Sequence, residues 1–294
     1  MDTFTHADLV FDVTDTPPPS GTDAAETVVL LHGFPEDRHS WEALAPALTA
    51  AGYRVLAPDL RGYSPRARPA ARSAYALDRL AGDVLALADA AGARRFHVVG
   101  HDWGAMLAWQ VAAAHPDRVS SLTALSVPHP MAFTRAMFTS TQALRSWYML
   151  VCQLPWLPEL VLSLRGGRLI GRGLVRAGLD EESADRYSVR AADRGAMRGP
   201  VNWYRGLPFD LRRPVPRVAV PTLYVWGTAD GYVSRAAAQL CPNYVTGSYR
   251  FLALDGASHW LPECEAGRIS AVLTEHLANA SAPGAGTAGV RTPH

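Results

Sequence analysis

The segment Gly100-His-Asp-Trp-Gly104 puts an aspartate where a nucleophile could stand. A strand ending at Val99 is expected before it and a helix beginning near Trp103 after it, so a tight turn must join them. Glycines two residues before and after Asp102 suit such a turn, because side chains there would clash. The Asp102 carboxylate would then face the N–H groups of a helix N-terminus. Because a carboxylate is ionised at neutral pH, it can attack carbon without a base, although the segment alone also fits a structural aspartate.

Two residues downstream could complete a catalytic triad. Asp230 follows an expected strand over residues 222–226, and His259 follows another over residues 249–254. Both positions are carboxyl ends of strands, where ligands bind in open α/β sheets. In the chain order nucleophile, acid, histidine, Asp230 would orient His259, and His259 would deprotonate water. A histidine taken alone is more often a surface or loop residue, so the order and placement carry this prediction.

A third segment, His32-Gly-Phe-Pro-Glu36, directly follows an expected strand over residues 27–31. The backbone N–H groups of Phe34 and Trp103 would together form an oxyanion hole, the alternative being that His-Gly marks an ordinary turn. The sequence shows no metal-ligand spacing and no glycine-rich phosphate loop. We therefore expect neither a metal nor an organic cofactor.

The elements that must position these residues alternate between short β-branched runs and longer Ala/Leu-rich runs. The expected strands cover residues 27–31, 53–57, 95–99, 119–127, 222–226 and 249–254. The expected helices cover residues 40–51, with Ser40 as N-cap and Gly52 as stop, 76–91, 103–114, 235–240 and 265–278. This alternation predicts an α/β fold with a mostly parallel central sheet flanked by helices.

The alternation breaks after Pro128. Residues 131–213 are helical in composition and rich in aromatic residues and arginine, and the strand signal returns at Val218. We expect a core domain of residues 1–130 and 214–280 with an inserted helical cap domain of residues 131–213. The stretch 281–294, rich in Gly, Ala and Pro, is expected to be a disordered tail.

Composition narrows the function. The chain has 294 residues, of which 48 % are hydrophobic and 19 % charged, so a large core can form. A net charge of +1 offers no global field for nucleic acid or an anionic membrane, and no stretch is apolar for long enough to span a bilayer. The three cysteines, Cys152, Cys241 and Cys264, are widely spaced, and their odd number does not suit a framework of disulfides. The N-terminus lacks the features of a secretion signal, so we expect a cytoplasmic protein. The oligomeric state stays open, a homodimer included.

Over nearly the whole chain outside the termini, the sequence resembles the epoxide hydrolase and haloalkane dehalogenase branch of the α/β-hydrolase superfamily. The resemblance is carried by His32–Glu36, Asp59-Leu-Arg-Gly-Tyr63, Gly100–Gly104, Asp230 and Ser258-His-Trp260. It implies an α/β-hydrolase fold with an inserted cap, and a small-molecule substrate together with water.

Two features of the resemblance favour epoxide hydrolases. Phe34 stands where dehalogenases of this type usually carry an asparagine. Asn202-Trp-Tyr-Arg205 is similar to the cap motif whose tyrosine opens the epoxide, and Ser146-Trp-Tyr-Met149, followed by Gln153-Leu-Pro155, is similar to the segment with the other tyrosine. These matches imply Tyr204 and Tyr148. Phenols stay protonated at neutral pH and can hydrogen-bond a developing alkoxide, which a halide leaving group does not need.

The resemblance therefore implies conversion of an epoxide to a vicinal diol through an ester on Asp102, hydrolysed by water that His259 and Asp230 activate. Phe34, Trp103, Tyr148 and Tyr204 would contact the substrate. Trp147, Trp156 and Trp203 are expected to pack the cap onto the core or to contact substrate. The alternatives are a haloalkane or haloacid dehalogenase with the same nucleophile and, more remotely, a non-catalytic ligand-binding sensor. Aryl, fatty and polyketide epoxides all stay open as substrates.

Overall fold

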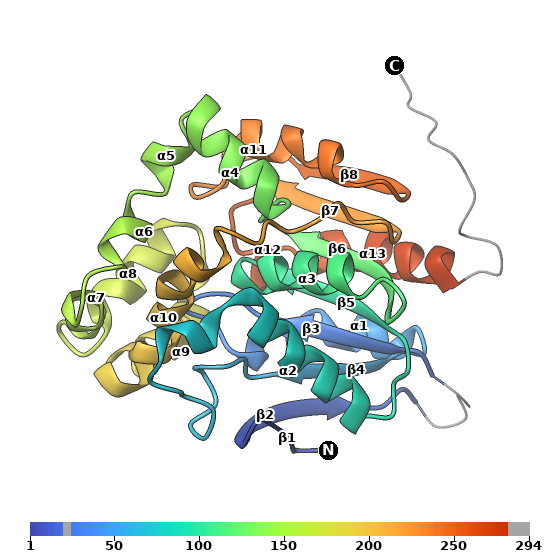
Figure 1. Cartoon of the computed structure of the whole chain (residues 1–294), viewed down its shortest axis with the longest axis horizontal. Coiled ribbons are helices and arrows are strands. Elements are labelled where there is room, and N and C mark those ends of the chain that lie inside the picture. The colour runs from blue at the N-terminus through green and yellow to red at the C-terminus, as the bar shows by residue number, and fades with distance from the viewer. Residues whose placement is uncertain (20–24, 282–294) are drawn as a thin grey trace.

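The computed structural model describes residues 1–19 and 25–281, in which one eight-stranded sheet carries helices on both faces (Figure 1). The strand order is β1-β2-β4-β3-β5-β6-β7-β8. The strands from β3 to β8 are mutually parallel, as the alternation predicts, and β1 and β2 are antiparallel. The strands are β1 (Thr3–His6), β2 (Leu9–Thr16), β3 (Thr27–Leu31), β4 (Arg54–Pro58), β5 (Phe96–His101), β6 (Val119–Leu125), β7 (Thr222–Gly227) and β8 (Tyr249–Leu254).

Different helices cover the two faces of the sheet, so alternate residues of one strand enter different cores. Val29 and Leu31 of β3 pack in the cluster that includes α2 and α3, whereas Val28 and Leu30 pack in the cluster with α1 and α13. The helices and 3-10 turns of this part are η1 (Arg38–Trp41), α1 (Ala45–Ala50), η2 (Arg72–Tyr75), α2 (Leu77–Ala90), α3 (Trp103–Ala114), α11 (Arg235–Leu240), η3 (Cys241–Tyr244), α12 (Leu261–Cys264) and α13 (Ala266–Ser281).

The antiparallel hairpin of β1 and β2 is a feature that the sequence analysis missed. Its two-residue turn, Ala7-Asp8, has positive φ at both residues, which is the geometry of a type I′ turn. The rings of Phe4 and Phe11 stack across the hairpin with centroids 4.7 Å apart. The signal was weak because the turn lacks the Asn-Gly or Asp-Gly pair that usually marks this geometry.

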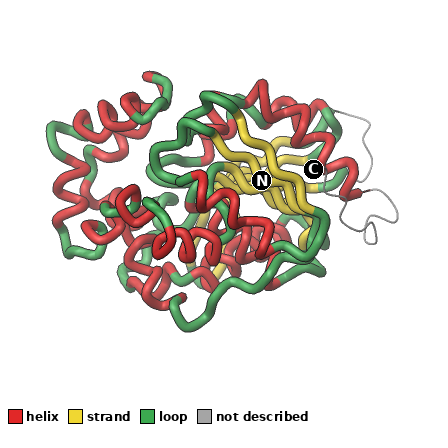
Figure 2. Tube along the Cα trace, turned by 90° about the horizontal axis from the view of Figure 1, so that it is seen from above, coloured by secondary structure: helices red, strands yellow, loops and turns green. Residues whose placement is uncertain are grey.

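Seven helices, called the cap helices below, follow β6 and precede β7. Helices α5 to α10 lie beyond one end of the sheet, at the left of Figure 1, whereas α4 packs beside α11 of the sheet domain. In Figure 2, helices at the left stand apart from the strands. This agrees with the expected helical composition of residues 131–213. The cap helices are α4 (Pro130–Thr139), α5 (Gln142–Arg145), α6 (Tyr148–Val151), α7 (Leu157–Ser163), α8 (Arg168–Arg176), α9 (Glu181–Ala191) and α10 (Arg194–Asp210).

Helix α10 anchors the cap helices to the sheet domain. The buried Trp203 donates its indole N–H to the carbonyl of Arg61 at 2.7 Å, and its ring centroid lies 5.8 Å from that of Trp103. Within the cap helices, the buried Arg205 guanidinium forms a bidentate ion pair with Glu159 at 2.5 and 2.9 Å. Tyr204 stands between these two anchored residues, so its position is held from both sides.

Several expected boundaries differ from the structure. The helix expected over 40–51 is two elements, η1 and α1; Asp37, rather than Ser40, caps the first, and the second begins beside Pro46. Gly52, at φ 94°, ends it as expected. The strand expected over 119–127 ends at Leu125. Ser281 ends α13, and the rest of the expected tail, 282–294, lies outside the described residues.

Candidate active site

Asp102 occupies the turn between β5 and α3 in a strained backbone conformation, with φ 49° and ψ −117°. A Cβ on Gly100 would come within 2.2 Å of the carbonyl oxygen of Gly104, and one on Gly104 within 1.9 Å of that of Leu31. Both glycines are therefore required by close backbone contacts. This geometry presents the Asp102 side chain, 17 % exposed, at the carboxyl end of the sheet.

His259 and Asp230 meet Asp102 from loops that follow β8 and β7. The Nδ1 atom of His259 lies 2.8 Å from Oδ2 of Asp230, and its Nε2 atom lies 3.4 Å from Oδ2 of Asp102. The other oxygen of Asp230 accepts the backbone N–H groups of Tyr232 and Val233 at 2.7 and 2.9 Å. Backbone N–H groups of its own loop thus fix the Asp230 carboxylate, which orients the imidazole of His259 toward Asp102. The three residues that the sequence selects for a triad lie within contact of one another.

The charges of this trio oppose the effect of burial. Burial, the largest influence on Asp102, favours its neutral form, but the hydrogen bond and charge of His259 lower the pKa of Asp102 below 3.8. Burial likewise disfavours a charged His259, yet the two carboxylates raise the pKa of His259 well above 6.5. Without ligand, the favoured state is an imidazolium between two carboxylates.

The backbone N–H of Phe34 donates to Oδ1 of Asp102 at 2.8 Å. A Cβ on Gly33 would lie 2.4 Å from the Cβ of Asp102, so only glycine allows this approach. Trp103 is the first residue of α3, where a backbone N–H has no acceptor within the helix. Of the two N–H groups expected to form an oxyanion hole, that of Phe34 contacts the Asp102 carboxylate, whereas that of Trp103 is free of an intrahelical acceptor at the next position in the chain.

The loop that carries Phe34 is fixed by a buried polar network. Oε2 of Glu36 accepts the N–H of Gly33 at 2.7 Å, and Oε1 lies 2.6 Å from Nδ1 of His101. The other ring nitrogen of His101 lies 2.8 Å from the carbonyl oxygen of His259. Glu36 and His101 have no exposed side-chain surface, and they link the Phe34 loop to the His259 loop.

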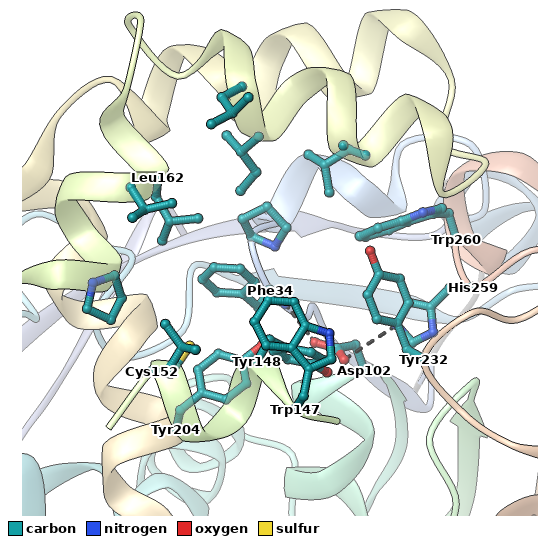
Figure 3. Close-up of a pocket in the computed structure, with 18 residues that line it drawn as sticks. Phe34, Asp102, Trp147, Tyr148, Cys152, Leu162, Tyr204, Tyr232, His259 and Trp260 are labelled. Carbon is teal, nitrogen blue, oxygen red and sulfur yellow. Dashed lines mark hydrogen bonds and ion pairs between the residues drawn. The ribbon is translucent and has the colours of Figure 1, made fainter. Parts of the chain in front are cut away.

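Tyr148 and Tyr204 come from α6 and α10 and lie beside Asp102 (Figure 3). Their rings meet edge to face with centroids 5.9 Å apart. Burial, followed by the charge of Asp102, raises the pKa of Tyr148 well above 10.0. Burial, followed by the neighbouring Tyr148 and Asp102, has the same effect on the pKa of Tyr204. Both hydroxyls are therefore protonated at neutral pH and can donate hydrogen bonds.

These groups border a cavity of about 340 Å³ between the sheet domain and the cap helices. Apart from Asp102, His259 and the tyrosine hydroxyls, its walls are mainly aromatic and aliphatic. The lining residues are Phe34, Pro35, Asp102, Trp147, Tyr148, Val151, Cys152, Pro158, Val161, Leu162, Leu169, Ile170, Gly173, Leu174, Tyr204, Tyr232, His259 and Trp260. A cavity of about 40 Å³, also bordered by Asp102 and His259, lies beside it and is lined by Trp103 and Met106.

Sequence reasoning missed a third phenol in the cavity. Tyr232 packs edge to face on the His259 ring, with centroids 4.9 Å apart, and on Tyr148, with centroids 6.0 Å apart. Burial, with the charges of Asp102 and Asp230, raises the pKa of Tyr232 to about 12. The signal that could have revealed it is its place two residues after Asp230, on a loop at the carboxyl end of β7.

The three tryptophans behave differently from one another. Trp203 is 1 % exposed and packs the cap helices onto the sheet domain, as expected. Trp147 lines the cavity while 64 % exposed, which is compatible with the expected contact to substrate. The expectation for Trp156 is wrong, because this residue is 68 % exposed and is absent from the cavity wall. A left-handed φ of 53° at Trp156 accompanies this outward position.

Within residues 1–19 and 25–281, His, Cys, Asp and Glu side chains form no group of three or more that could hold a metal ion. None of the helices in the same ranges combines the length and apolar character needed to cross a bilayer.

Comparison with known proteins places this site in a family context. A model described as alpha/beta hydrolase fold matches residues 26–265. Epoxide hydrolase A of Mycobacterium tuberculosis is 34 % identical over 299 residues, covering 88 % of this chain and 92 % of the relative. Epoxide hydrolase 4 of Homo sapiens is also 34 % identical, over 83 % of this chain and 70 % of the relative.

The solved structures agree. The crystal structure of epoxide hydrolase A from Mycobacterium thermoresistibile superposes with a TM-score of 0.79 at 27 % identity, covering 94 % of this chain and 97 % of the other. A structure described as a novel epoxide hydrolase from metagenomes of hot environments superposes with a TM-score of 0.81 at 26 % identity, and it also covers 94 % of this chain and 97 % of the other.

Proposed function

The chain belongs to the alpha/beta hydrolase family and, within it, to the epoxide hydrolases, and on this basis we propose that it converts an epoxide to a vicinal diol through a covalent ester on Asp102. The observation that carries the proposal is the setting of the Asp102 carboxylate. One oxygen accepts the N–H of Phe34, the other faces His259, and two protonated phenols border the same cavity.

In the first step, a carboxylate oxygen of Asp102 attacks one epoxide carbon and the carbon–oxygen bond of the ring breaks. Tyr148 and Tyr204 donate hydrogen bonds to the ring oxygen, and one of them supplies the proton that the alkoxide takes up. Because burial raises the pKa of both phenols, they keep their protons until an alkoxide, itself a strong base, develops beside them. The product of this step is a hydroxyalkyl ester of Asp102.

Ester formation prepares the second step by changing the charge beside His259. The ester has no negative charge, so the hydrogen bond and charge of Asp102 no longer raise the pKa of His259. The imidazolium then releases its proton, which restores the phenol that protonated the alkoxide. Alkylation therefore removes one of the two charges that favour the imidazolium and shifts His259 toward the neutral base, while Asp230 continues to raise its pKa.

In the second step, His259 deprotonates a water molecule that attacks the carbonyl carbon of the ester. The N–H groups of Phe34 and Trp103 hydrogen-bond the resulting oxyanion, and Asp230 stabilises the imidazolium. The adjoining cavity of about 40 Å³ exceeds the ~10–15 Å³ that one water needs, and it borders both Asp102 and His259. Collapse of the intermediate releases the diol and regenerates Asp102.

The alternatives have less support. A dehalogenase must hold a halide, and Phe34 offers a phenyl ring instead of an amide at that place, while a halide needs none of the phenols. A ligand sensor would have no use for the ion-paired trio of Asp102, His259 and Asp230. The apolar cavity walls favour an uncharged, lipophilic epoxide.

The experiment that tests the proposal is intact-protein mass spectrometry of a His259→Gln variant after exposure to styrene oxide. The glutamine side chain cannot act as the base, so we expect an adduct equal to the mass of the epoxide, located on the peptide that contains Asp102. An Asp102→Asn variant is the matched control and should stay unmodified. An inactive His259→Gln variant without any adduct would contradict the proposal.

A further inference from the structure

Large apolar side chains on the surface are concentrated on the cap helices. Of the fourteen exposed ones recorded for residues 1–19 and 25–281, thirteen lie between residues 131 and 213, and only Phe251 lies on the sheet domain. Leu144 and Leu150 are 77 % and 76 % exposed, and Trp147 between them is 64 % exposed. Exposed apolar side chains gathered on one part of a molecule mark a site that contacts a protein, a membrane or a ligand.

The charges of the chain are divided in the same way. Residues 131–213 contain 13 arginines and 7 acidic residues, whereas the rest of the chain contains 15 arginines and 20 acidic residues. The net charge of +1 therefore conceals a basic cap and an acidic remainder. Such a distribution orients the cap helices toward an anionic surface and the sheet domain away from it.

Helix α8, which contributes to the wall of the active-site cavity, carries both properties. Arg168, Arg172 and Arg176 are exposed at successive four-residue intervals, so they form a basic stripe along one side of the helix, where they border Glu181 and Asp185 of α9. The neighbouring Leu169 is 45 % exposed and also lines the cavity, as does the exposed Trp147. Helix α8 thus presents apolar side chains to the cavity and the basic stripe on another side of the same helix.

We propose that this cap face, defined by Leu144, Trp147, Leu150 and Leu169 with the arginine stripe of α8, binds the surface of an anionic phospholipid bilayer. Arginines would contact the headgroups while the apolar side chains enter the boundary of the acyl chains. Given the proposed function, a lipophilic epoxide would pass from the bilayer into the cavity without crossing water. The expectation of no membrane partner rested on net charge and on spanning segments, neither of which describes a peripheral contact.

Other occupants fit these observations less well. A second copy placed cap face to cap face would bring two basic surfaces together, which is electrostatically unfavourable. Nucleic acid would pair with the arginines but would leave Leu144 and Leu150 in water. An anionic bilayer matches both the charge and the apolar side chains.

The test is sedimentation of the purified protein with vesicles of phosphatidylcholine alone or of phosphatidylcholine mixed with phosphatidylglycerol. We expect binding to the mixed vesicles, weakened by added salt. A triple variant with Arg168, Arg172 and Arg176 changed to Gln should partition roughly 10- to 100-fold less, since each arginine near the surface contributes about a fivefold factor. The matched control changes Arg79, Arg94 and Arg268, which are exposed on the sheet domain, to Gln. This control should bind like the unmodified protein.

A second variant, Leu144→Ser with Leu150→Ser, tests the apolar contribution and should also reduce binding. Absence of binding to anionic vesicles at low salt would overturn the proposal, as would binding that neither cap variant weakens. A dimer that dissociates in the Leu144/Leu150 variant, without any vesicle binding, would instead assign the cap face to a second copy. Vesicle binding requires no turnover, and hydrolysis of dissolved styrene oxide is measured separately, so failure of this proposal is distinguishable from failure of the proposed function.

Discussion

The Nε2 atom of His259 lies 3.4 Å from Oδ2 of Asp102, so the base and the nucleophile form an ion pair before any substrate is present. This pair ties the charge of His259 to the covalent state of Asp102. Because the carboxylates raise the pKa of His259, the imidazolium stabilises the unmodified protein. Loss of the Asp102 charge on alkylation then favours the neutral imidazole that the second step needs.

This ion pair predicts how stability depends on pH. The pKa of His259 is raised in the folded state, so its contribution is fully present below about 6.5, the pKa of an unfolded histidine, and is lost as pH rises through the folded value. A His259→Gln variant should melt several degrees below the unmodified protein near pH 6, and the gap in Tm should narrow toward pH 10. Thermal denaturation followed by circular dichroism measures both.

His276 supplies the control for that experiment. Burial lowers the pKa of His276 to about 4, so its side chain is neutral across the same range. Since an unfolded histidine titrates near 6.5, the Tm difference between a His276→Gln variant and the unmodified protein should stay constant from about pH 8 to pH 10, where this histidine is neutral in both states. A constant gap for His259→Gln as well would argue against a charged His259 in the free protein.

Removal of the phenol hydroxyls from the cavity should slow epoxide ring opening stepwise, one hydroxyl at a time. Phenylalanine at position 148 or 204 keeps the ring but removes the donor, so each single variant should slow alkylation of Asp102 by roughly 10²-fold, the lower end for general acid catalysis. The double variant Tyr148→Phe with Tyr204→Phe should be inactive toward epoxides. Rapid-quench measurement of ester formation from styrene oxide gives these rates.

Tyr232→Phe is the matched variant for this series. It removes a third hydroxyl from the same cavity but leaves both proposed donors in place, so alkylation should slow by less than tenfold. If the Tyr148/Tyr204 double variant kept its turnover while Tyr232→Phe lost it, the roles of the three phenols would have to be reassigned.

The close approach of Gly33 to Asp102 makes a further prediction. An alanine Cβ at position 33 would lie 2.4 Å from the Cβ of Asp102, so the loop must shift and take the N–H of Phe34 with it. Loss of one oxyanion donor typically costs about 10²–10³ in kcat, and Gly33→Ala should lose activity in that range. Steady-state kinetics would measure kcat for this variant and for the control variant Gly231→Ala. The added Cβ at position 231 meets no atom within 4 Å, so the control should keep its activity.

The features that could be predicted from the sequence are those determined by residues close together in the chain. The turn from β5 to α3 needs small residues at 100 and 104, and the strand and helix around it have strong patterns of their own. Because parallel strands share one carboxyl edge, the order of Asp102, Asp230 and His259 was enough to anticipate that they lie close together. Their roles in catalysis stay predictions.

The features that could not be predicted from the sequence depend on packing between distant segments of the chain. The place of Tyr232 after β7 does not by itself reveal that its ring packs on His259, and the pairing of Glu36 with His101 joins a loop residue to the last residue of β5. The cap helices are short and connected by irregular turns, so their individual bounds and the outward position of Trp156 could not be inferred. The hairpin at the N-terminus was hidden by an unusual turn sequence.

The most direct test of the covalent route is a single turnover of excess enzyme with styrene oxide in water enriched in heavy oxygen. If water attacks the carbonyl of an ester on Asp102, the first diol released carries an unlabelled oxygen from the carboxylate, and the heavy isotope appears in the peptide that contains Asp102. If water attacks the epoxide itself, the first diol carries the label and Asp102 remains unlabelled, which would contradict the account.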